Sequence, residues 1–177
     1  MYKIRIHGRG GQGAKKAAKI IGQAAFDMGK QVQDFALYGA ERRGAPVMSF
    51  VRIDDIPILE RGYIDDPDVV IVLDKALLEI VNVSAGLDEN GLLIINSEHE
   101  PVLDTPAVVK HIDATTIALE IIGKPIFNTI MLGALAKFTN IISKDALDRA
   151  VEEELSKYPD KIIKANKDAV KKCYEVA

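Results

Sequence analysis

The fold of this chain is decided by the stretch Gly8-Arg9-Gly10-Gly11-Gln12-Gly13. An apolar run at residues 2–6 precedes it, and an amphipathic segment beginning at Ala14 follows it. In that segment small and apolar residues recur at the three- and four-residue spacing of one helix face, and Gly29 stands where a left-handed residue would end the helix. The stretch is therefore predicted to be a turn between a first strand and a first helix.

This turn has the features of an anion-binding site. Glycines lack Cβ atoms and let a ligand approach the backbone closely. The first amide groups of a helix have no acceptor within the helix and carry a partial positive charge. Lys15 and Lys16 follow in the first helical turn, where cations oppose the helix dipole. Either a bound polyanion offsets that repulsion, or both lysines are solvated surface residues, and both interpretations stay open.

Composition limits the class of protein. A length of 177 residues favours one domain over residues 1–177, and a net charge of -3 argues against a general nucleic-acid binder. No apolar run is long enough to span a membrane and no signal peptide is recognisable, so we expect a cytoplasmic protein. Cys173 is the single cysteine, which is too few for an iron–sulfur cluster or a cysteine-based zinc site. Any redox metal must be held by another chain.

Strands and helices alternate along the rest of the sequence. Strands are expected at residues 30–37, 47–53, 69–73, 92–95 and 108–112, with residues 56–58 pairing as a hairpin with the strand before them. Helices are expected at residues 75–81, 115–122, 129–138 and 160–174, and another after Ser143 as N-cap. Residues 69–73 and 92–95 are apolar without alternation, which is typical of strands covered on both faces. The pattern predicts an α/β, three-layer Rossmann-like fold with a mostly parallel sheet and a helical C-terminal tail.

Ligands in such sheets collect beyond the carboxyl ends of the strands. The loop carrying Arg42 and Arg43 could reach that edge, as could Asp74 and Asn96. The arginines would bind phosphate or carboxylate there, or they are surface residues paired with nearby acids. Asp74 and Asn128 have a second interpretation as helix caps.

The remaining titratable residues suggest no reaction centre. His7 is interpreted as structural, His99 and His111 lack metal-ligand spacing, and Cys173 is expected to pack passively. No nucleophile lies in an arrangement with a base, so we expect the chain to bind and position a ligand without performing the chemistry alone.

One alternative is a free-standing dinucleotide-binding oxidoreductase of the Rossmann type. The glycine spacing satisfies that fingerprint, and Asp34 lies about 20 residues further on. Arg9 and Gln12 are bulky for such a turn, however, and apolar residues 35–37 follow Asp34, whereas the ribose-binding acid belongs at the end of its strand.

Three motifs together resemble the gamma subunit of 2-oxoacid:ferredoxin oxidoreductases, of which the pyruvate synthase type matches best. They lie at residues 6–13, at residues 38–47 (Tyr-Gly-Ala-Glu-Arg-Arg-Gly-Ala-Pro-Val) and at residues 128–136 (Asn-Thr-Ile-Met-Leu-Gly-Ala-Leu-Ala). The similarity covers nearly the whole chain in the same order. The Ala14-Lys15-Lys16 run departs from the family, which has an uncharged residue and a small hydroxyl residue there.

The resemblance implies a complex that converts a 2-oxoacid and CoA to acyl-CoA, CO2 and reduced ferredoxin. Thiamine diphosphate, Mg and the [4Fe–4S] clusters would belong to the partner alpha, beta and delta subunits. This chain would hold no cofactor, would be inactive alone, and would help to enclose CoA or serve a purely architectural role. The implied CoA-binding residues are Arg9, Gly10, Gly11, Gln12, Arg42, Arg43 and Asn128.

Overall fold

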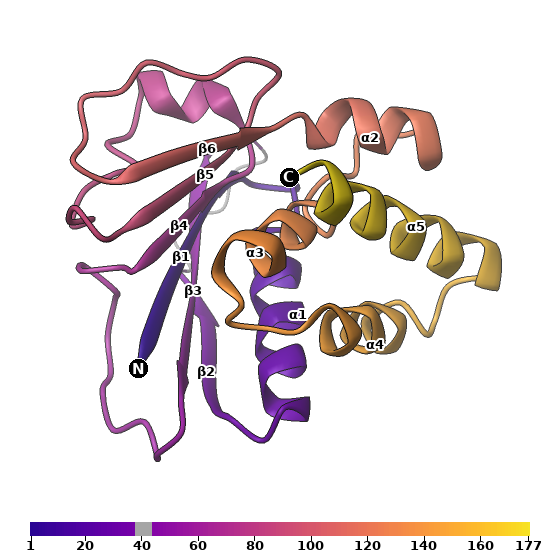
Figure 1. The fold of residues 1–177 in the computed structure, drawn as a ribbon, viewed down its shortest axis with the longest axis horizontal. Coiled ribbons are helices and arrows are strands. Elements are labelled where there is room, and N and C mark those ends of the chain that lie inside the picture. The colour runs from indigo at the N-terminus through magenta and orange to yellow at the C-terminus, as the bar shows by residue number, and fades with distance from the viewer. Residues whose placement is uncertain (38–43) are drawn as a thin grey trace.

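A six-stranded sheet forms the centre of the computed structural model, which describes residues 1–37 and 44–177 (Figure 1). Across the sheet the strands lie in the order β2 (Gln31–Ala36), β3 (Pro46–Asp54), β1 (Tyr2–Arg9), β4 (Val69–Val72), β5 (Leu92–Asn96) and β6 (Val108–Ile112). Neighbouring strands from β1 to β6 pair in parallel, whereas β3 pairs antiparallel with both β1 and β2. The mostly parallel sheet expected from the sequence is confirmed.

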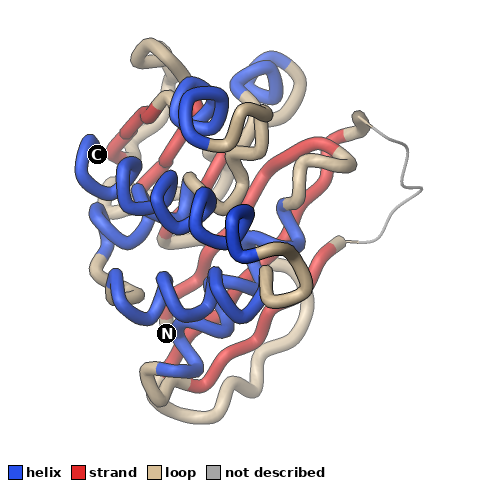
Figure 2. Tube along the Cα trace, turned by 90° about the vertical axis from the view of Figure 1, so that its right-hand side faces the viewer, coloured by secondary structure: helices blue, strands red, loops and turns tan. Residues whose placement is uncertain are grey.

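Five α-helices lie on one face of this sheet (Figures 1 and 2). They are α1 (Ala14–Asp27), α2 (Ala114–Ile121), α3 (Met131–Thr139), α4 (Lys144–Glu154) and α5 (Asp160–Val176). The last four form the expected helical tail, which folds back over the sheet and packs against α1 through α4. Two predicted helix boundaries are confirmed: the Ser143 hydroxyl accepts from the Ala146 amide, and Gly29 has a left-handed φ of 81° after α1.

The central strands are buried on both faces, as their apolar runs predict. Along β1, Ile4 and Ile6 point to the helices, and Arg5 and His7 lie on the opposite face, where all but a few per cent of each side chain is buried. On that second face the short 3-10 helix η1 (Lys75–Glu79) and irregular segments cover β4 and β5. The three-layer α/β fold is confirmed, with one helical layer and one thin irregular layer.

A segment at residues 55–66, here called the strap, crosses the second face over β1 and β3. Arg52 donates to the Gly62 and Tyr63 carbonyls at 3.0 and 3.2 Å, and Arg5 donates to the Ile64 carbonyl at 3.2 Å. The predicted hairpin at residues 56–58 is wrong, because these buried guanidinium groups hold the strap across the strands and leave it no strand to pair with.

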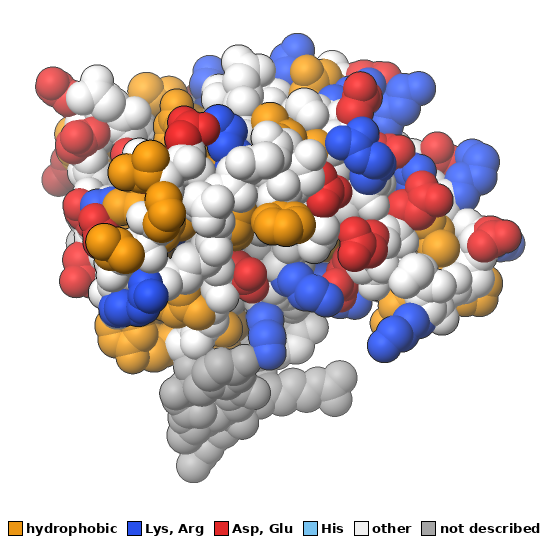
Figure 3. Space-filling view, turned by 90° about the horizontal axis from the view of Figure 1, so that it is seen from below, with side chains coloured by type: hydrophobic (Ala, Val, Ile, Leu, Met, Phe, Trp, Pro, Cys, Tyr) orange, Lys and Arg blue, Asp and Glu red, His pale blue; other side chains and the backbone are white. Residues whose placement is uncertain are grey.

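Three large apolar side chains of the strap face outward, among exposed charged residues. Ile56, Leu59 and Tyr63 are exposed there. Seen from below, hydrophobic side chains gather on this side of the molecule, whereas lysines, arginines and acids dominate the helical side (Figure 3).

Candidate functional site

The glycine turn lies at the point in the sheet where chain connections leave in opposite directions. β1 continues through the turn into α1 on the helical face, and the neighbouring β4 continues into η1 on the other face. Ligands of open α/β sheets bind in the crevice at such a point, beyond the carboxyl ends of the strands. Gly11 and Gly13 have φ values of 94° and 80°, a conformation that disfavours residues with a Cβ.

Backbone hydrogen bonds fix the turn to the chain that enters β3. The Gly10 amide donates to the Ala45 carbonyl at 2.8 Å, and the Gly44 amide donates to the Gly10 carbonyl at 3.1 Å. Arg42 and Arg43, predicted as CoA ligands, immediately precede Gly44 but lie outside the described residues.

Arg9 and Gln12, two predicted ligand residues, both contact Asp74. The Arg9 Nε and the Gln12 Nε2 each lie 2.9 Å from Asp74 Oδ2. Arg9 also donates to the Gly44 carbonyl at 3.1 Å, and its own amide donates to Gln12 Oε1 at 2.7 Å. The two side chains are therefore parts of the turn's own framework.

Asp74 is the N-cap of η1, as its position predicted, and it also binds Arg9 and Gln12, which the sequence did not reveal. Its Oδ1 accepts from the Ala76 amide at 3.0 Å at the start of η1, and its Oδ2 receives Arg9 and Gln12. Partial burial raises the pKa of the Asp74 carboxyl, but hydrogen bonds from Gln12, Ala76 and Arg9 outweigh burial and hold the pKa below its ordinary value. The one feature of the sequence that pointed to this contact was the position of Asp74 directly after an apolar strand, at the edge where the glycine turn was also expected.

Asn128 braces the turn from the opposite side. Its side-chain amide donates to the Gly13 carbonyl at 3.3 Å, and the residue is buried. The alternative interpretation of Asn128 as a helix cap is wrong, because α3 begins at Met131 with Ile130 as N-cap and without a side-chain cap. The structure thus brings Arg9, Gln12 and Asn128 together around the glycines.

A cavity of about 380 Å³ opens beside the turn, beyond the ends of β4, β5 and β6. Its walls include the carboxylates of Asp74, Glu98 and Asp113 but one lysine, Lys75. Asn96 shapes the floor, donating to the Leu73 carbonyl and to Thr115 Oγ1, both at 3.0 Å. Because its charged lining is mainly acidic, this cavity is suited to uncharged or cationic groups and opposes phosphates.

Lys16 faces away from the turn. Its Nζ lies 3.9 Å from a Glu154 carboxylate oxygen and 5.4 Å from the centre of the Tyr158 ring. These contacts favour the interpretation of Lys16 as a residue of the helical layer over that of a ligand contact.

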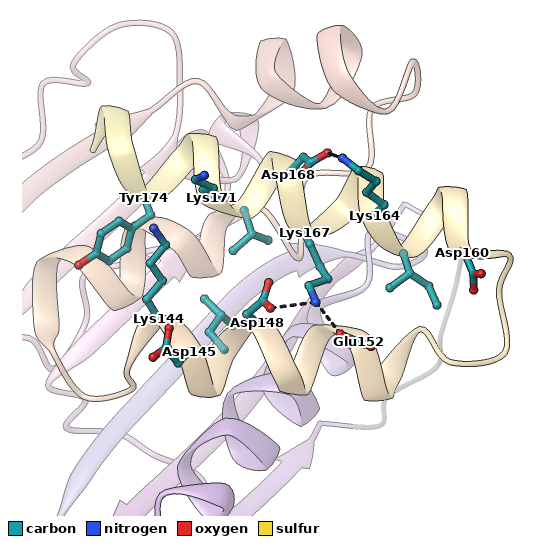
Figure 4. A pocket seen from close by; sticks show the side chains of 13 residues that line it. Lys144, Asp145, Asp148, Glu152, Asp160, Lys164, Lys167, Asp168, Lys171 and Tyr174 are labelled. Atoms are coloured by element: carbon teal, nitrogen blue, oxygen red, sulfur yellow. Dashed lines mark hydrogen bonds and ion pairs between the residues drawn. The ribbon is translucent and has the colours of Figure 1, made fainter.

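A larger hollow of about 530 Å³ lies between α4 and α5, away from the sheet edge. Figure 4 shows Lys167 reaching from α5 toward Asp148 and Glu152 on α4, and the Lys167 Nζ lies 2.9 Å from Asp148. Lys164 pairs with Asp168 one turn further along α5. Since these lysines are paired with acids of the same two helices and the hollow lies away from the carboxyl ends of the strands, we place the functional site at the turn.

The other candidate residues fit structural roles. His7 accepts from Arg5 Nε at 3.0 Å, and burial, aided by the Arg5 charge, lowers its pKa to about 4. Burial raises the pKa of the Cys173 thiol to about 12, which does not suit a cluster ligand. Across residues 1–37 and 44–177, no three His, Cys, Asp or Glu side chains group as a metal site, and no helix is long and apolar enough to cross a membrane.

Fold and site together define an α/β protein with a glycine turn at the carboxyl edge of its sheet. The sequence matches the family model described as pyruvate ferredoxin/flavodoxin oxidoreductase over residues 3–176, and the chain belongs to that family. It is 49% identical to the common subunit gamma of pyruvate/ketoisovalerate oxidoreductases of Thermococcus litoralis, over 99% of this chain and 96% of that one. It is 46% identical to the pyruvate synthase subunit PorC of Methanothermobacter thermautotrophicus, over 99% and 95%.

A solved structure supports the same assignment. The pyruvate oxidoreductase subunit PORC of Thermotoga maritima superimposes with a TM-score of 0.84 at 39% identity, over 98% of this chain and 95% of that chain. The predicted resemblance is confirmed, and the free-standing dinucleotide enzyme is not supported. That alternative depended on Asp34, which lies on β2 opposite Val51 of β3. Its side chain lies beside Gly22 in the middle of α1, away from the turn.

Proposed function

We propose that this chain is the gamma subunit of a 2-oxoacid:ferredoxin oxidoreductase of the pyruvate synthase type, and that its glycine turn forms part of the wall around CoA. The observation that carries the proposal is the position of the turn at the carboxyl edge between β1 and β4. There the left-handed glycines leave the backbone open to a ligand, at the positive end of α1.

The chain's own chemistry is binding and positioning. The amides of Arg9, Gly10 and Gln12 already donate within the chain, so the phosphates of CoA would meet the Gly11 and Gly13 amides and the arginines at positions 42 and 43. The acid-lined cavity opposes them. His7 is buried and neutral at physiological pH and cannot serve as an acid or base for a ligand outside. The complex would convert a 2-oxoacid, pyruvate in this proposal, and CoA to acyl-CoA, CO2 and reduced ferredoxin.

The redox cofactors would be held by partner subunits. Cys173 is buried in α5, so the described residues do not fit a [4Fe–4S] cluster. Thiamine diphosphate, which supplies the decarboxylation chemistry when bound, its Mg²⁺ and the clusters are assigned to the alpha, beta and delta subunits. The cytoplasmic location expected from the sequence remains part of this proposal.

Purified complex, assembled with and without this chain, tests the proposal. CoA-dependent pyruvate oxidation should require the chain, and the chain alone should be inactive. In the complete complex, Arg42→Ala and Arg43→Ala should each raise the KM for CoA about tenfold with little change in kcat, since a charged hydrogen bond contributes about 1–3 kcal/mol.

The matched control is Arg61→Ala, which removes an exposed strap arginine whose donors reach the Ile58 and Glu60 carbonyls. It should leave the KM for CoA unchanged. A KM that stays constant in both loop variants would favour an architectural role over CoA binding, provided that the subunits still assemble.

A further inference from the structure

Asp74 connects two parts of the chain that are remote in sequence. It lies two residues after β4, whereas Arg9 and Gln12 belong to the turn 65 and 62 residues earlier. One oxygen, Oδ2, receives both turn residues, and the other caps η1 through the Ala76 amide. The carboxylate thus contacts three separate donors at once.

The side chains of Arg9 and Gln12 are each held by two hydrogen bonds. Gln12 accepts from the Arg9 amide through Oε1 and donates to Asp74 through Nε2. Arg9 donates through Nε to Asp74 and through Nη1 to the Gly44 carbonyl. The Arg9 and Asp74 side chains are 27% and 22% exposed, so the ion pair is partly shielded from water. A turn of flexible glycines is thereby held in one shape from outside its own sequence.

We propose that Asp74 is the positioning residue of the glycine turn, holding Arg9 and Gln12 so that the backbone faces the ligand in a fixed geometry. The inference rests on the proposed CoA function for its consequence, although the effect on the turn can be measured without CoA. Arg9 and Gln12 are then framework residues, and the Gly11 and Gly13 amides meet the anion, since the Arg9, Gly10 and Gln12 amides donate within the chain. The opposite role, in which Asp74 competes with a ligand phosphate for Arg9, is the alternative that the test must separate.

The two roles predict opposite effects of removing the carboxylate. If Asp74 positions the turn, its loss frees the glycines and weakens CoA binding, because the ordering cost must then be met on binding. If Asp74 competes for Arg9, its loss releases the guanidinium and strengthens CoA binding.

Asp74→Ser in the assembled complex separates positioning from capping. Serine is a favoured N-cap and keeps a partner for the Ala76 amide, but its side chain is too short to span to Arg9 and Gln12. Asp104→Ser, at an exposed aspartate outside the site, is the matched control. Asp74→Ala removes both interactions and shows what loss of the cap adds to the effect.

Two measurements decide the outcome. Hydrogen exchange over residues 6–14, followed by mass spectrometry without CoA, should become roughly tenfold faster in Asp74→Ser, since opening the turn costs less free energy. The KM for CoA should rise about tenfold while kcat changes less than twofold, as expected for lost ground-state positioning. Asp104→Ser should match the unmodified complex in both.

The inference and the proposed function fail in different ways. Unchanged exchange in the turn, or a lower KM for CoA, overturns the positioning role of Asp74. Faster exchange together with an unchanged KM supports the positioning role and overturns the proposal that the turn contributes to CoA binding.

Discussion

Asn128 and Gly13 are 115 residues apart in sequence, yet the Asn128 side-chain amide lies against the Gly13 backbone and donates to its carbonyl oxygen. A Cβ placed on Gly13 would lie 2.6 Å from Asn128 Nδ2, closer than real Cβ contacts allow. Gly13 also has a left-handed φ of 80° at the N-cap of α1. Glycine is therefore required at this position for two independent reasons, the backbone conformation and the closeness of Asn128.

Substituting Gly13→Ala is expected to cost more than substituting Gly11→Ala. Both variants should lose about 1–2 kcal/mol of stability, because alanine disfavours the left-handed conformation of these positions. A Cβ at Gly11, however, would meet nothing within 4 Å. Gly13→Ala should lose roughly 1–3 kcal/mol more through overpacking against Asn128. Urea unfolding measures both variants.

The double variant Gly13→Ala, Asn128→Ala checks the cause. Shortening Asn128 removes the clashing amide, so the two substitutions should be non-additive and the extra cost of Gly13→Ala should largely disappear. Equal costs for Gly13→Ala and Gly11→Ala would contradict a steric role for Asn128.

Most helix ends could be predicted because the residues that cap or break a helix lie next to it in the sequence. Ser143 caps α4, Gly29 follows α1, and Pro159 precedes α5, each within a residue or two of the expected position. The glycine turn was predictable for the same reason, since its glycines stand between a strand and a helix with opposite periodicities.

The second face of the sheet and the framework of the site depend on contacts that leave no local trace. Arg5 and Arg52 look like the outward residues of alternating strands, yet both are buried and hold irregular chain to the sheet. Asp74 looked like a cap and also binds Arg9, 65 residues away. An alternating pattern gives the face on which a side chain lies, but it does not tell whether that face is covered by solvent or by a strap.

Arg5→Leu should destabilise the chain by at least about 3 kcal/mol. Arg5 donates to the carbonyls of Ile64, Val83 and Ala85, and each buried carbonyl left without a donor costs about 1–3 kcal/mol. Urea unfolding measures the loss, and limited proteolysis should show earlier cleavage in the strap.

Arg61→Leu provides the comparison, because Arg61 is an exposed arginine of the strap itself. Its effect should stay within about 0.5 kcal/mol, as is usual at surface positions. If Arg5→Leu fell in that same range, the strap would be held mainly by its apolar contacts.

The buried His7 predicts a loss of stability in mild acid. Burial, together with the Arg5 charge, lowers its folded-state pKa from 6.5 to about 4. Between these values the unfolded chain binds a proton that the folded chain does not, so the free energy of unfolding falls as the pH drops from 6.5 to 4. This loss of stability is complete below pH 4 and amounts to about 3 kcal/mol.

Urea unfolding across this pH range, compared between the natural sequence and His7→Gln, isolates the contribution. The variant should lose this part of the pH dependence, whereas His99→Gln should keep it because His99 is exposed. Parallel curves for the natural sequence and His7→Gln would mean that His7 titrates normally.

Gly133 is expected to set how closely α5 packs against α3. A Cβ there would meet the Val170 carbonyl oxygen and would lie 3.0 Å from the Tyr174 amide nitrogen and 3.1 Å from the Cys173 Cβ. Since two of these neighbours are backbone atoms of α5, the helices would have to separate. Gly133→Ala should therefore lower the free energy of unfolding by roughly 1–3 kcal/mol.

The matched control is Gly22→Ala, at the buried helical glycine of α1. Its nearest contacts would be side-chain atoms, the Val32 Cγ1 at 3.2 Å and the Asp34 Oδ1 at 3.3 Å, and these can shift. Because alanine favours a helix interior over glycine by about 1 kcal/mol, Gly22→Ala should be neutral or stabilising. If both variants gained stability in urea unfolding, the spacing of α3 and α5 would tolerate a methyl group, and Gly133 would have no role in their packing.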